Sequence, residues 1–198
     1  MILNLKFGKR VSIEAWDKKE VFLKADISIN GGELNEAHIM DSILHDQSIT
    51  IEADLDENVV GTNYWCNCDK NGPSRYNIVH REKQMWLCTE IDYTVYVPAG
   101  ADLELETISG DVKIVNMKGA IEAKSVSGTV DVIIPQGQQA DVRLESVMGR
   151  VTSNPDITTL VDGLRPMLAR KLNGKLNGGG KNVHLESVTG DVTLRSQE

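Results

Sequence analysis

The chain has 198 residues, of which 40% are apolar, so it can bury a sizeable core and is not a disordered chain. Its 17 Gly and 5 Pro are far too few for collagen, and its longest apolar runs are too short to cross a membrane. The formal net charge is −8, with 21 basic against 29 acidic residues, which makes duplex nucleic acid an unfavourable partner.

Residues 1–60 show the alternation of apolar and polar side chains that is typical of β-strands. The pattern is clear in residues 11–15, 21–29 and 49–55. Because the repeat described below has no copy here, we interpret residues 1–92 as an N-terminal β region, made of degenerate coils or of a separate cap. The first ten residues lack the apolar stretch of a secretory signal. We therefore expect either a cytoplasmic protein or an exported one whose leader is absent from this sequence.

Residues 61–92 contain all three cysteines, Cys66, Cys68 and Cys88, together with His80. These four residues could supply four zinc ligands, but their spacing matches no familiar zinc motif. We therefore predict a disulfide or small buried thiols here, with no metal and no other cofactor. Three further histidines stand alone in the sequence and are interpreted as structural: His38, His45 and His184.

The strongest feature of the sequence is an internal repeat. Four segments share the order apolar, polar, Ser/Thr, Ile/Val, any residue, Gly, any residue, Val, and their glycines are 18, 21 and 41 residues apart. Short strands joined by corners and repeated about every 20 residues predict an all-β fold, a β-solenoid over residues 93–198 that continues the N-terminal region. An antiparallel β-sandwich is the alternative, but it does not require the same octapeptide in every second strand. The repeat glycines are Gly110, Gly128, Gly149 and Gly190.

Each copy is predicted to bend at its glycine. Leu103, Leu105 and Thr107 share one parity in the sequence, whereas Ile108 and Val112 take the other. A one-residue slip would turn the core outward, so the chain must bend or bulge at the Ser-Gly step. Glycine suits such a corner because it adopts positive φ without a Cβ clash.

Coils that stack at about 4.8 Å place equivalent residues above one another, and we expect the units to wind in tandem order. Charged residues of alternating sign, such as Glu106, Lys124 and Glu145, are predicted to form an outer ladder. Two aliphatic columns are predicted inside the coils, Ile108, Val126, Val147 and Val188 in one and Val112, Val130, Val151 and Val192 in the other.

The segment 154–172 interrupts the β pattern and is predicted to be a non-β insert. Its apolar residues follow helical spacing, and Asn154-Pro155 is a plausible helix start. Gly163 and Pro166 argue against a long regular helix. This insert accounts for the long interval between Gly149 and Gly190.

Basic residues are concentrated in residues 150–181, where six of them stand against two acids, a net charge of +4 that leaves −12 for the remainder of the chain. Such a patch could receive an anionic sugar, a phosphate or an acidic protein surface. A solvated face of the insert is the favoured interpretation of the same charges. The residues are Arg150, Arg165, Arg170, Lys171, Lys175 and Lys181.

Catalytic motifs are absent from the sequence, which contains neither a Gly-x-Ser-x-Gly elbow nor a Walker loop. Outward carboxylates on adjacent coils could form the acid pair of a polysaccharide-cleaving enzyme. The same positions carry the mixed charges of a solvated ladder, so we predict no enzymatic activity and no catalytic residues. The carboxylates in question are Glu106, Asp111, Asp131, Glu145, Glu186 and Asp191.

The runs 92–112 and 125–132, with their Ser-Gly-Asp-Val and Ser-Gly-Thr-Val units, resemble the bacterial putative-adhesin family of β-strand repeat proteins, a domain of unknown function common in Bacteroidetes. The resemblance covers residues 90–198 and, more loosely, 11–60. It implies a β-helix-like fold, usually exported to the envelope or cell surface, and carries over no catalytic positions.

Three functions follow as hypotheses. The first is a non-enzymatic surface adhesin or scaffold that binds an extended glycan or protein partner. The second is a regulatory protein-interaction module of an envelope-response pathway, and the third is a polysaccharide-active enzyme. The sequence leaves the oligomeric state open.

Overall fold

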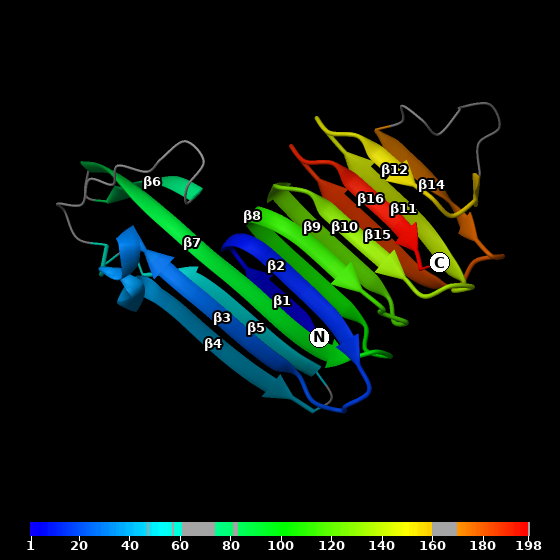
Figure 1. Ribbon diagram of the computed structural model, residues 1–198, viewed down its shortest axis with the longest axis horizontal. Helices are drawn as coiled ribbons and strands as arrows, with labels where there is room; N and C mark the ends of the chain where they lie inside the picture. Colours follow the sequence, from blue (N-terminus) through cyan, green and yellow to red (C-terminus); the bar gives the residue numbers. More distant parts are fainter. Residues whose placement is uncertain (47, 57, 61–73, 81–82, 160–169, 198) are drawn as a thin grey trace.

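The computed structural model describes residues 1–46, 48–56, 58–60, 74–80, 83–159 and 170–197, and within these ranges it contains sixteen strands, two 3₁₀ turns and no α-helix (Figure 1). The all-β solenoid-like fold predicted from the repeat is confirmed. The turns are η1 (Asn30–Gly32) and η2 (Asn35–Ala37). The strands are β1 (Ile2–Leu5), β2 (Phe7–Trp16), β3 (Phe22–Ile29), β4 (His38–His45), β5 (Ser48–Leu55), β6 (Ser74–His80), β7 (Lys83–Pro98), β8 (Leu103–Val115), β9 (Ile121–Ser127), β10 (Val130–Ile134), β11 (Ala140–Ser146), β12 (Val151–Ser153), β13 (Ile157–Thr159), β14 (Lys171–Leu176), β15 (Lys181–Ser187) and β16 (Val192–Ser196).

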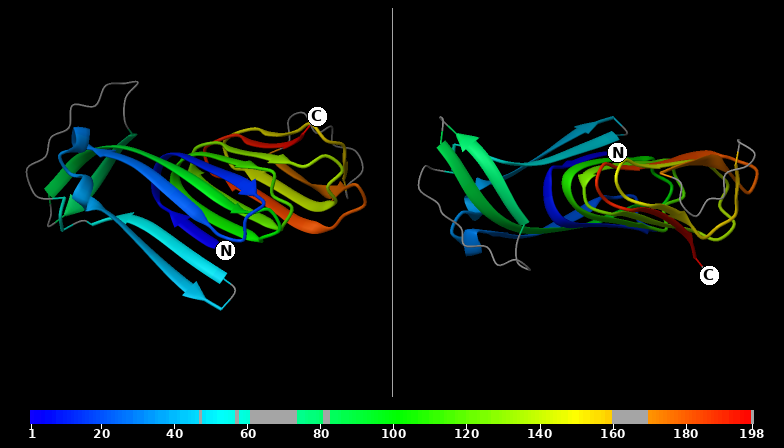
Figure 2. Two further views of the ribbon diagram at one scale, coloured as in Figure 1. Left: turned by 60° about the horizontal axis from the view of Figure 1, so that its bottom comes forward. Right: turned by 90° about the horizontal axis from the view of Figure 1, so that it is seen from above.

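The coils form a flattened tube with two walls of strands (Figure 2). The first wall has the order β4-β5-β1-β8-β9-β15-β11-β14-β13, and the second has β7-β2-β8-β10-β16-β12, with β3 and β6 on the far side of β7. Strand β8 bends at Gly110, so its first half belongs to the first wall and its second half to the other. Apolar side chains from both walls fill the tube.

The coils do not stack in the order in which they occur along the chain. The expected tandem winding is wrong at the fourth repeat, because β15 lies between β9 and β11, and β16 lies between β10 and β12 (Figure 1). All these pairings are parallel and in repeat register, as in Leu185 against Ala123 on one side and Leu144 on the other. Since the copies carry the same pattern, any copy can satisfy any neighbour, and sequence order alone does not fix stacking order.

One predicted aliphatic column is inside and the other is not. Val112, Val130, Val192 and Val151 stack in register and are at most 1% exposed. In contrast Ile108, Val126 and Val147 are 42%, 51% and 55% exposed. The inner position at this corner is taken by the preceding Ser or Thr, which is buried in every copy, so the next residue points outward.

The buried hydroxyls explain why a polar residue recurs inside the core. Ser187 Oγ accepts the backbone N–H of Gly190 and donates to the carbonyl oxygen of Gly128, at 2.9 Å in both cases. Ser146 makes the same pair of bonds to Gly149 and to Gly190. Each of these two hydroxyls therefore holds its own corner closed and ties it to the neighbouring coil.

The repeat glycines are needed mainly because the corners touch. A methyl group at Gly190 would lie 1.8 Å from the carbonyl oxygen of Gly128, and one at Gly149 would lie 2.1 Å from that of Gly190. Positive φ, the reason expected from the sequence, applies only to Gly110 and Gly128, at 114° and 132°. At Gly149 and Gly190 the close approach of two backbones excludes any side chain.

The N-terminal region supplies a degenerate coil. Strands β1 and β2 pair in parallel with the two halves of β8, with Leu3 beside Leu105 and Val11 beside Val112. A register shift between Phe7 and Arg10 accommodates one extra residue at this corner. Strand β7 runs through residue 92, so the two regions expected from the sequence share one continuous strand.

The expectation of a non-β insert over residues 154–172 is wrong at both ends of the segment, which contain β13 and the start of β14. Ile157–Thr159 form β13, which pairs antiparallel with β14, so the helical interpretation is wrong there. Three successive β-branched residues favour a strand over a helix. Most of the predicted helical residues lie in 160–169, outside the described residues.

Candidate binding groove on the outer face

Four aliphatic residues, three of them exposed and Val188 half-buried, form a continuous strip on the outside of the first wall. Strand pairing places Ile108 beside Val126, Val126 beside Val188 and Val188 beside Val147, each as the residue that follows the buried Ser or Thr. We call these four residues the aliphatic ladder. Ladders of apolar groups on a solvent face are unusual in a monomer and mark contact surfaces when they are contiguous.

The hairpin of β4 and β5 turns the strip into a groove. Strand β5 pairs with β1, and β4 forms the outermost strand of the first wall (Figure 1). One hollow of about 550 Å³ is lined by Ile39 of β4 together with three ladder residues, Ile108, Val126 and Val188. Its remaining lining is Asn4, Lys6, Asp41, Glu52, Ala53, Asp54, Glu106, Thr107, Lys124, Ser125 and Glu186.

The groove is acidic as well as apolar. Five carboxylates and two lysines line it, an excess of three negative charges. Lys6 is paired with Asp54, and Lys124 with Glu122 at 2.7 Å and Glu106 at 3.7 Å. The hydrogen bond that Lys124 donates to Glu122 raises the pKa of Lys124, and the one that Lys6 donates to Asp54 raises the pKa of Lys6. Both lysines are therefore already engaged with carboxylates.

The predicted basic patch is divided rather than gathered. Arg150 lies by the second wall and contacts Asp191 at 3.3 Å, whereas Lys171 contacts Glu145 at 2.9 Å on the first wall and Lys181 contacts Asp102 at 3.1 Å. Arg170 and Lys175 are exposed near β14, and Arg165 lies outside the described residues. Arg150, Lys171 and Lys181 therefore each neutralise a carboxylate on a neighbouring strand or coil.

The carboxylates considered for catalysis are divided between the two walls. Glu106, Glu145 and Glu186 face outward from the first wall, whereas Asp111, Asp131 and Asp191 belong to the second. Two of the latter bind the backbone of the next coil, since Asp111 accepts the N–H of Thr129 at 2.9 Å and Asp191 that of Arg150 at 2.8 Å. The hydrogen bond from the Arg150 backbone lowers the pKa of Asp191.

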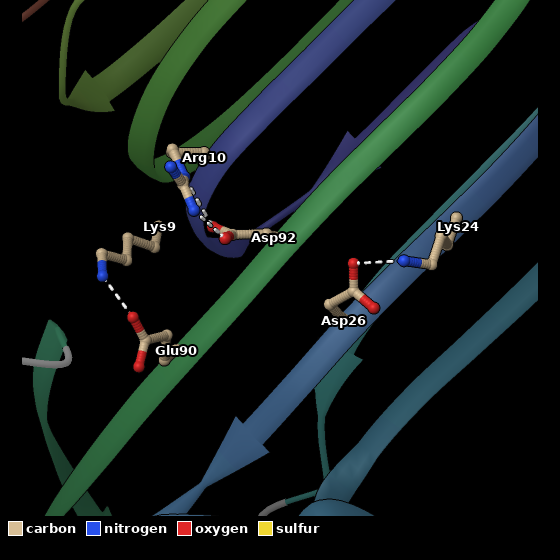
Figure 3. Close-up of polar contacts among 6 residues, drawn as sticks. All are labelled: Lys9, Arg10, Lys24, Asp26, Glu90 and Asp92. Carbon is tan, nitrogen blue, oxygen red and sulfur yellow. Dashed lines mark hydrogen bonds and ion pairs between the residues drawn. The ribbon is translucent and has the colours of Figure 1, made fainter.

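The outer face of the second wall carries several ion pairs on β2, β3 and β7 (Figure 3). The guanidinium of Arg10 binds Asp92 on the neighbouring strand with two hydrogen bonds, which lower the pKa of that carboxyl. Such cross-strand pairs support the strand register. The other pairs in this view are Lys9 with Glu90 and Lys24 with Asp26, the latter at 2.7 Å.

Cys88 is disulfide-bonded, which agrees with the disulfide interpretation of the cysteine segment. Cys66 and Cys68 lie outside the described residues, as does the side chain of His80. His38 is structural, because its Nε2 lies 2.8 Å from the hydroxyl of the buried Tyr93. Among the described residues, no group of three or more His, Cys, Asp or Glu is arranged to hold a metal ion.

The described part of the chain has no helix that is long and apolar enough to span a bilayer.

Comparison with known families agrees with the architecture. A profile for the domain described as Toastrack DUF4097, a domain of unknown function, matches residues 23–195. The chain belongs to the Toastrack DUF4097 family. The resemblance noted from the Ser-Gly repeats is confirmed at the level of this family. No curated protein matches the chain.

One solved structure shares the Toastrack fold of this chain along nearly its whole length. It is described as a putative cell adhesion protein from Clostridium sporogenes, has 14% sequence identity to this chain and superimposes with a TM-score of 0.53. The match covers 99% of this chain and 92% of that one. At this identity the similarity establishes the fold alone.

The groove is not predicted from the sequence, for an identifiable reason. Sequence reasoning places the ladder residues in the core because they are aliphatic and recur with the repeat. Sequence reasoning does not select Ile39 at all. In the structure β4 is apolar on both faces, and its four apolar side chains are 43–75% exposed: Ile39, Met40, Ile43 and Leu44. A strand that is apolar on both faces yet lies at a sheet edge is the signal that would have indicated a contact surface.

Proposed function

We propose that this protein is a non-enzymatic binding module of the bacterial envelope or cell surface, and that its groove holds an extended protein segment. The observation that supports this most directly is the aliphatic ladder, which exposes apolar area on the outside of a rigid β-stack. The description of the structural neighbour as a cell adhesion protein points the same way. A disulfide at Cys88 favours an oxidising compartment outside the cytoplasm.

The shape of the groove suits an elongated partner. Its lining runs from β4 to β15 across five strand-to-strand steps, a span of about 24 Å at the usual spacing of about 4.8 Å. An extended peptide of about seven residues covers this span at about 3.3 Å per residue. The partner would meet one aliphatic side chain on each of β8, β9 and β15, because these three strands pair in parallel and in repeat register.

The chemistry of the lining favours a cationic and apolar polypeptide over a glycan. The excess of three carboxylates calls for Lys or Arg on the partner, and the ladder calls for aliphatic side chains between them. Sugar rings commonly stack on aromatic faces, and the described lining of the groove contains no aromatic residue. The favoured partner is therefore an extended segment that carries both aliphatic and basic side chains on the face that meets the groove.

A direct binding measurement tests this function. A fluorescent twelve-residue peptide with the repeat Val-Val-Lys-Lys (the Val-Lys peptide), which places both side-chain types on each face, is titrated with the protein. A peptide of the same length with the repeat Val-Val-Glu-Glu (the Val-Glu peptide) is titrated alongside it. We expect the Val-Lys peptide to bind, the Val-Glu peptide not to bind, and V126D to weaken binding at least tenfold. F22D is the matched control, since Phe22 is as exposed as Val126 but lies on the second wall.

Two results would overturn this assignment. One is equal binding of the Val-Lys peptide by the unsubstituted protein and V126D. The other is saturable binding of a neutral oligosaccharide that V126D abolishes, which would make the groove a glycan site. Release of reducing sugar from an acidic polysaccharide would contradict the non-enzymatic part of the proposal.

A further inference from the structure

The free edge of β4 is built for pairing with another strand. Among the described residues β4 pairs with β5 alone, and residues 39–45 are all exposed, so no described part of the molecule covers its second edge. An edge of eight residues without a bulge presents a row of backbone N–H and C=O groups. Figure 2 shows the hairpin extending away from the stack of coils.

The usual protections of an edge strand are missing here. Natural edges carry Lys, Pro or bulges, but β4 has the sequence HIMDSILH, with Asp41 as its only carboxylate and no Lys, Arg or Pro. Both faces are apolar, since Met40 and Leu44 share one face and Ile39 and Ile43 the other. Met40 is 47% and Leu44 75% exposed. An unprotected apolar edge of this length needs a partner strand.

We propose that β4 pairs antiparallel with β4 of a second copy of this chain, forming a two-fold dimer with a continuous first wall. A two-fold axis perpendicular to the sheet is the operation that brings one strand edge against itself, and such interfaces are self-complementary. Opposed residues must then point to the same face, so the axis passes through one residue and its copy.

Of the two longest registers, only one is free of conflict. Axes at Asp41 or Ser42 pair the most residues of β4, and an axis at Asp41 would place two carboxylates directly opposite each other, which is destabilising. An axis at Ser42 places Ser42 against its own copy, Met40 against Leu44 of the second copy, and Asp41 against Ile43 of the second copy. This arrangement buries the two most exposed side chains on that face against each other and opposes no like charges.

The dimer would also join the two binding surfaces. Because the axis is perpendicular to the sheet, the outer faces of both first walls point the same way, and Ile39, which lines the groove, lies next to the interface. Two grooves on one surface let a partner with two segments bind by avidity. The dimer itself rests on the β4 edge and does not depend on what the groove binds.

Oxidative cross-linking tests the register directly. Opposed Cα atoms in an antiparallel pair are about 4.5–5.5 Å apart, within the range that a disulfide spans, so S42C should give a covalent dimer under mild oxidation. In the same register two copies of residue 41 are offset by two positions and lie about 8 Å apart, so D41C should not cross-link. The unsubstituted protein, with its own three cysteines, is the background control.

Sedimentation equilibrium gives the independent measurement. The unsubstituted protein should be dimeric at micromolar concentration, and M40K/L44K should be monomeric with an unchanged far-ultraviolet spectrum. A monomeric unsubstituted protein would overturn the proposal, as would cross-linking of D41C to the same extent as S42C. A dimer that M40K/L44K leaves intact would place the interface elsewhere and would also overturn it. If Val-Lys peptide binding is lost while the dimer persists, only the proposed function fails.

Discussion

Ser187 donates a hydrogen bond of 2.9 Å to the carbonyl oxygen of Gly128, a residue 59 positions earlier in the chain. This bond joins the fourth repeat to the second, and Ser146 joins the third repeat to the fourth in the same way. Two buried hydroxyls therefore hold the corners of the second, fourth and third coils together. Their geometry also shows that the fourth coil is inserted between the second and the third.

Replacing Ser187 by Ala should destabilise the protein by about 1–3 kcal/mol, because the Gly190 N–H and the Gly128 carbonyl both lose a partner. S125A is the matched control, since Ser125 is equally buried but its hydroxyl has no partner among the described residues. Urea unfolding measures both variants. Equal decreases in the free energy of unfolding of S187A and S125A would mean that the hydroxyl bridges contribute nothing beyond packing.

Replacing Gly190 by Ala should cost about 1–3 kcal/mol or more, because the new methyl group would meet the backbone carbonyl of Gly128 and force the coils apart. G100A should be neutral or slightly stabilising, since a methyl group at Gly100 would meet nothing within 4 Å and the residue has no positive φ. Thermal melts compare the two. A G190A protein as stable as G100A would contradict the close stacking of the corners.

Val130 and Val126 test which aliphatic column is internal. V130D should lose more than about 3 kcal/mol and largely unfold, because Val130 is fully buried and the aspartate would be an unpaired buried charge. V126D should stay folded, because Val126 is 51% exposed. Circular dichroism and urea unfolding distinguish the two. Comparable stability of the two variants would mean that the assignment of inside and outside is wrong.

The stability of the protein should fall between neutral pH and about pH 5.5, in part because of His38. Burial lowers the pKa of His38 below its ordinary value of 6.5, so the native state holds the ring neutral. As the pH falls through 6.5, the unfolded chain takes up a proton that the native state does not, and the free energy of unfolding decreases.

The measurement for His38 is urea unfolding at both ends of this pH range. H38Q removes the titration, so its unfolding free energy should change less with pH than that of the unsubstituted protein. An equal pH dependence in the two proteins would assign the effect to other groups.

Much of the fold was predictable because short-range patterns set it. The alternation in residues 103–107 and the recurring glycines led to strands with corners, and the Val112 column was placed inside correctly. The structure of the insert was harder to predict from the sequence. Ile157 fits a helical spacing, but in the structure it belongs to a strand that pairs with β14. A short apolar pattern of this kind is decided by whichever partner strand is available.

The strands, the corners and the register follow from the sequence alone, since each repeat carries the residues that its neighbours require. The order of the coils and the side on which Ile108 and Val126 lie, and with them the groove, depend on the three-dimensional packing of the chain. Equivalent repeats can stack in any order, and here β14 pairs with one edge of β11, which leaves the other edge for β15. An aliphatic residue beside a corner can face either way, and here it faces solvent because the Ser or Thr that precedes it is buried and adjacent side chains point to opposite faces.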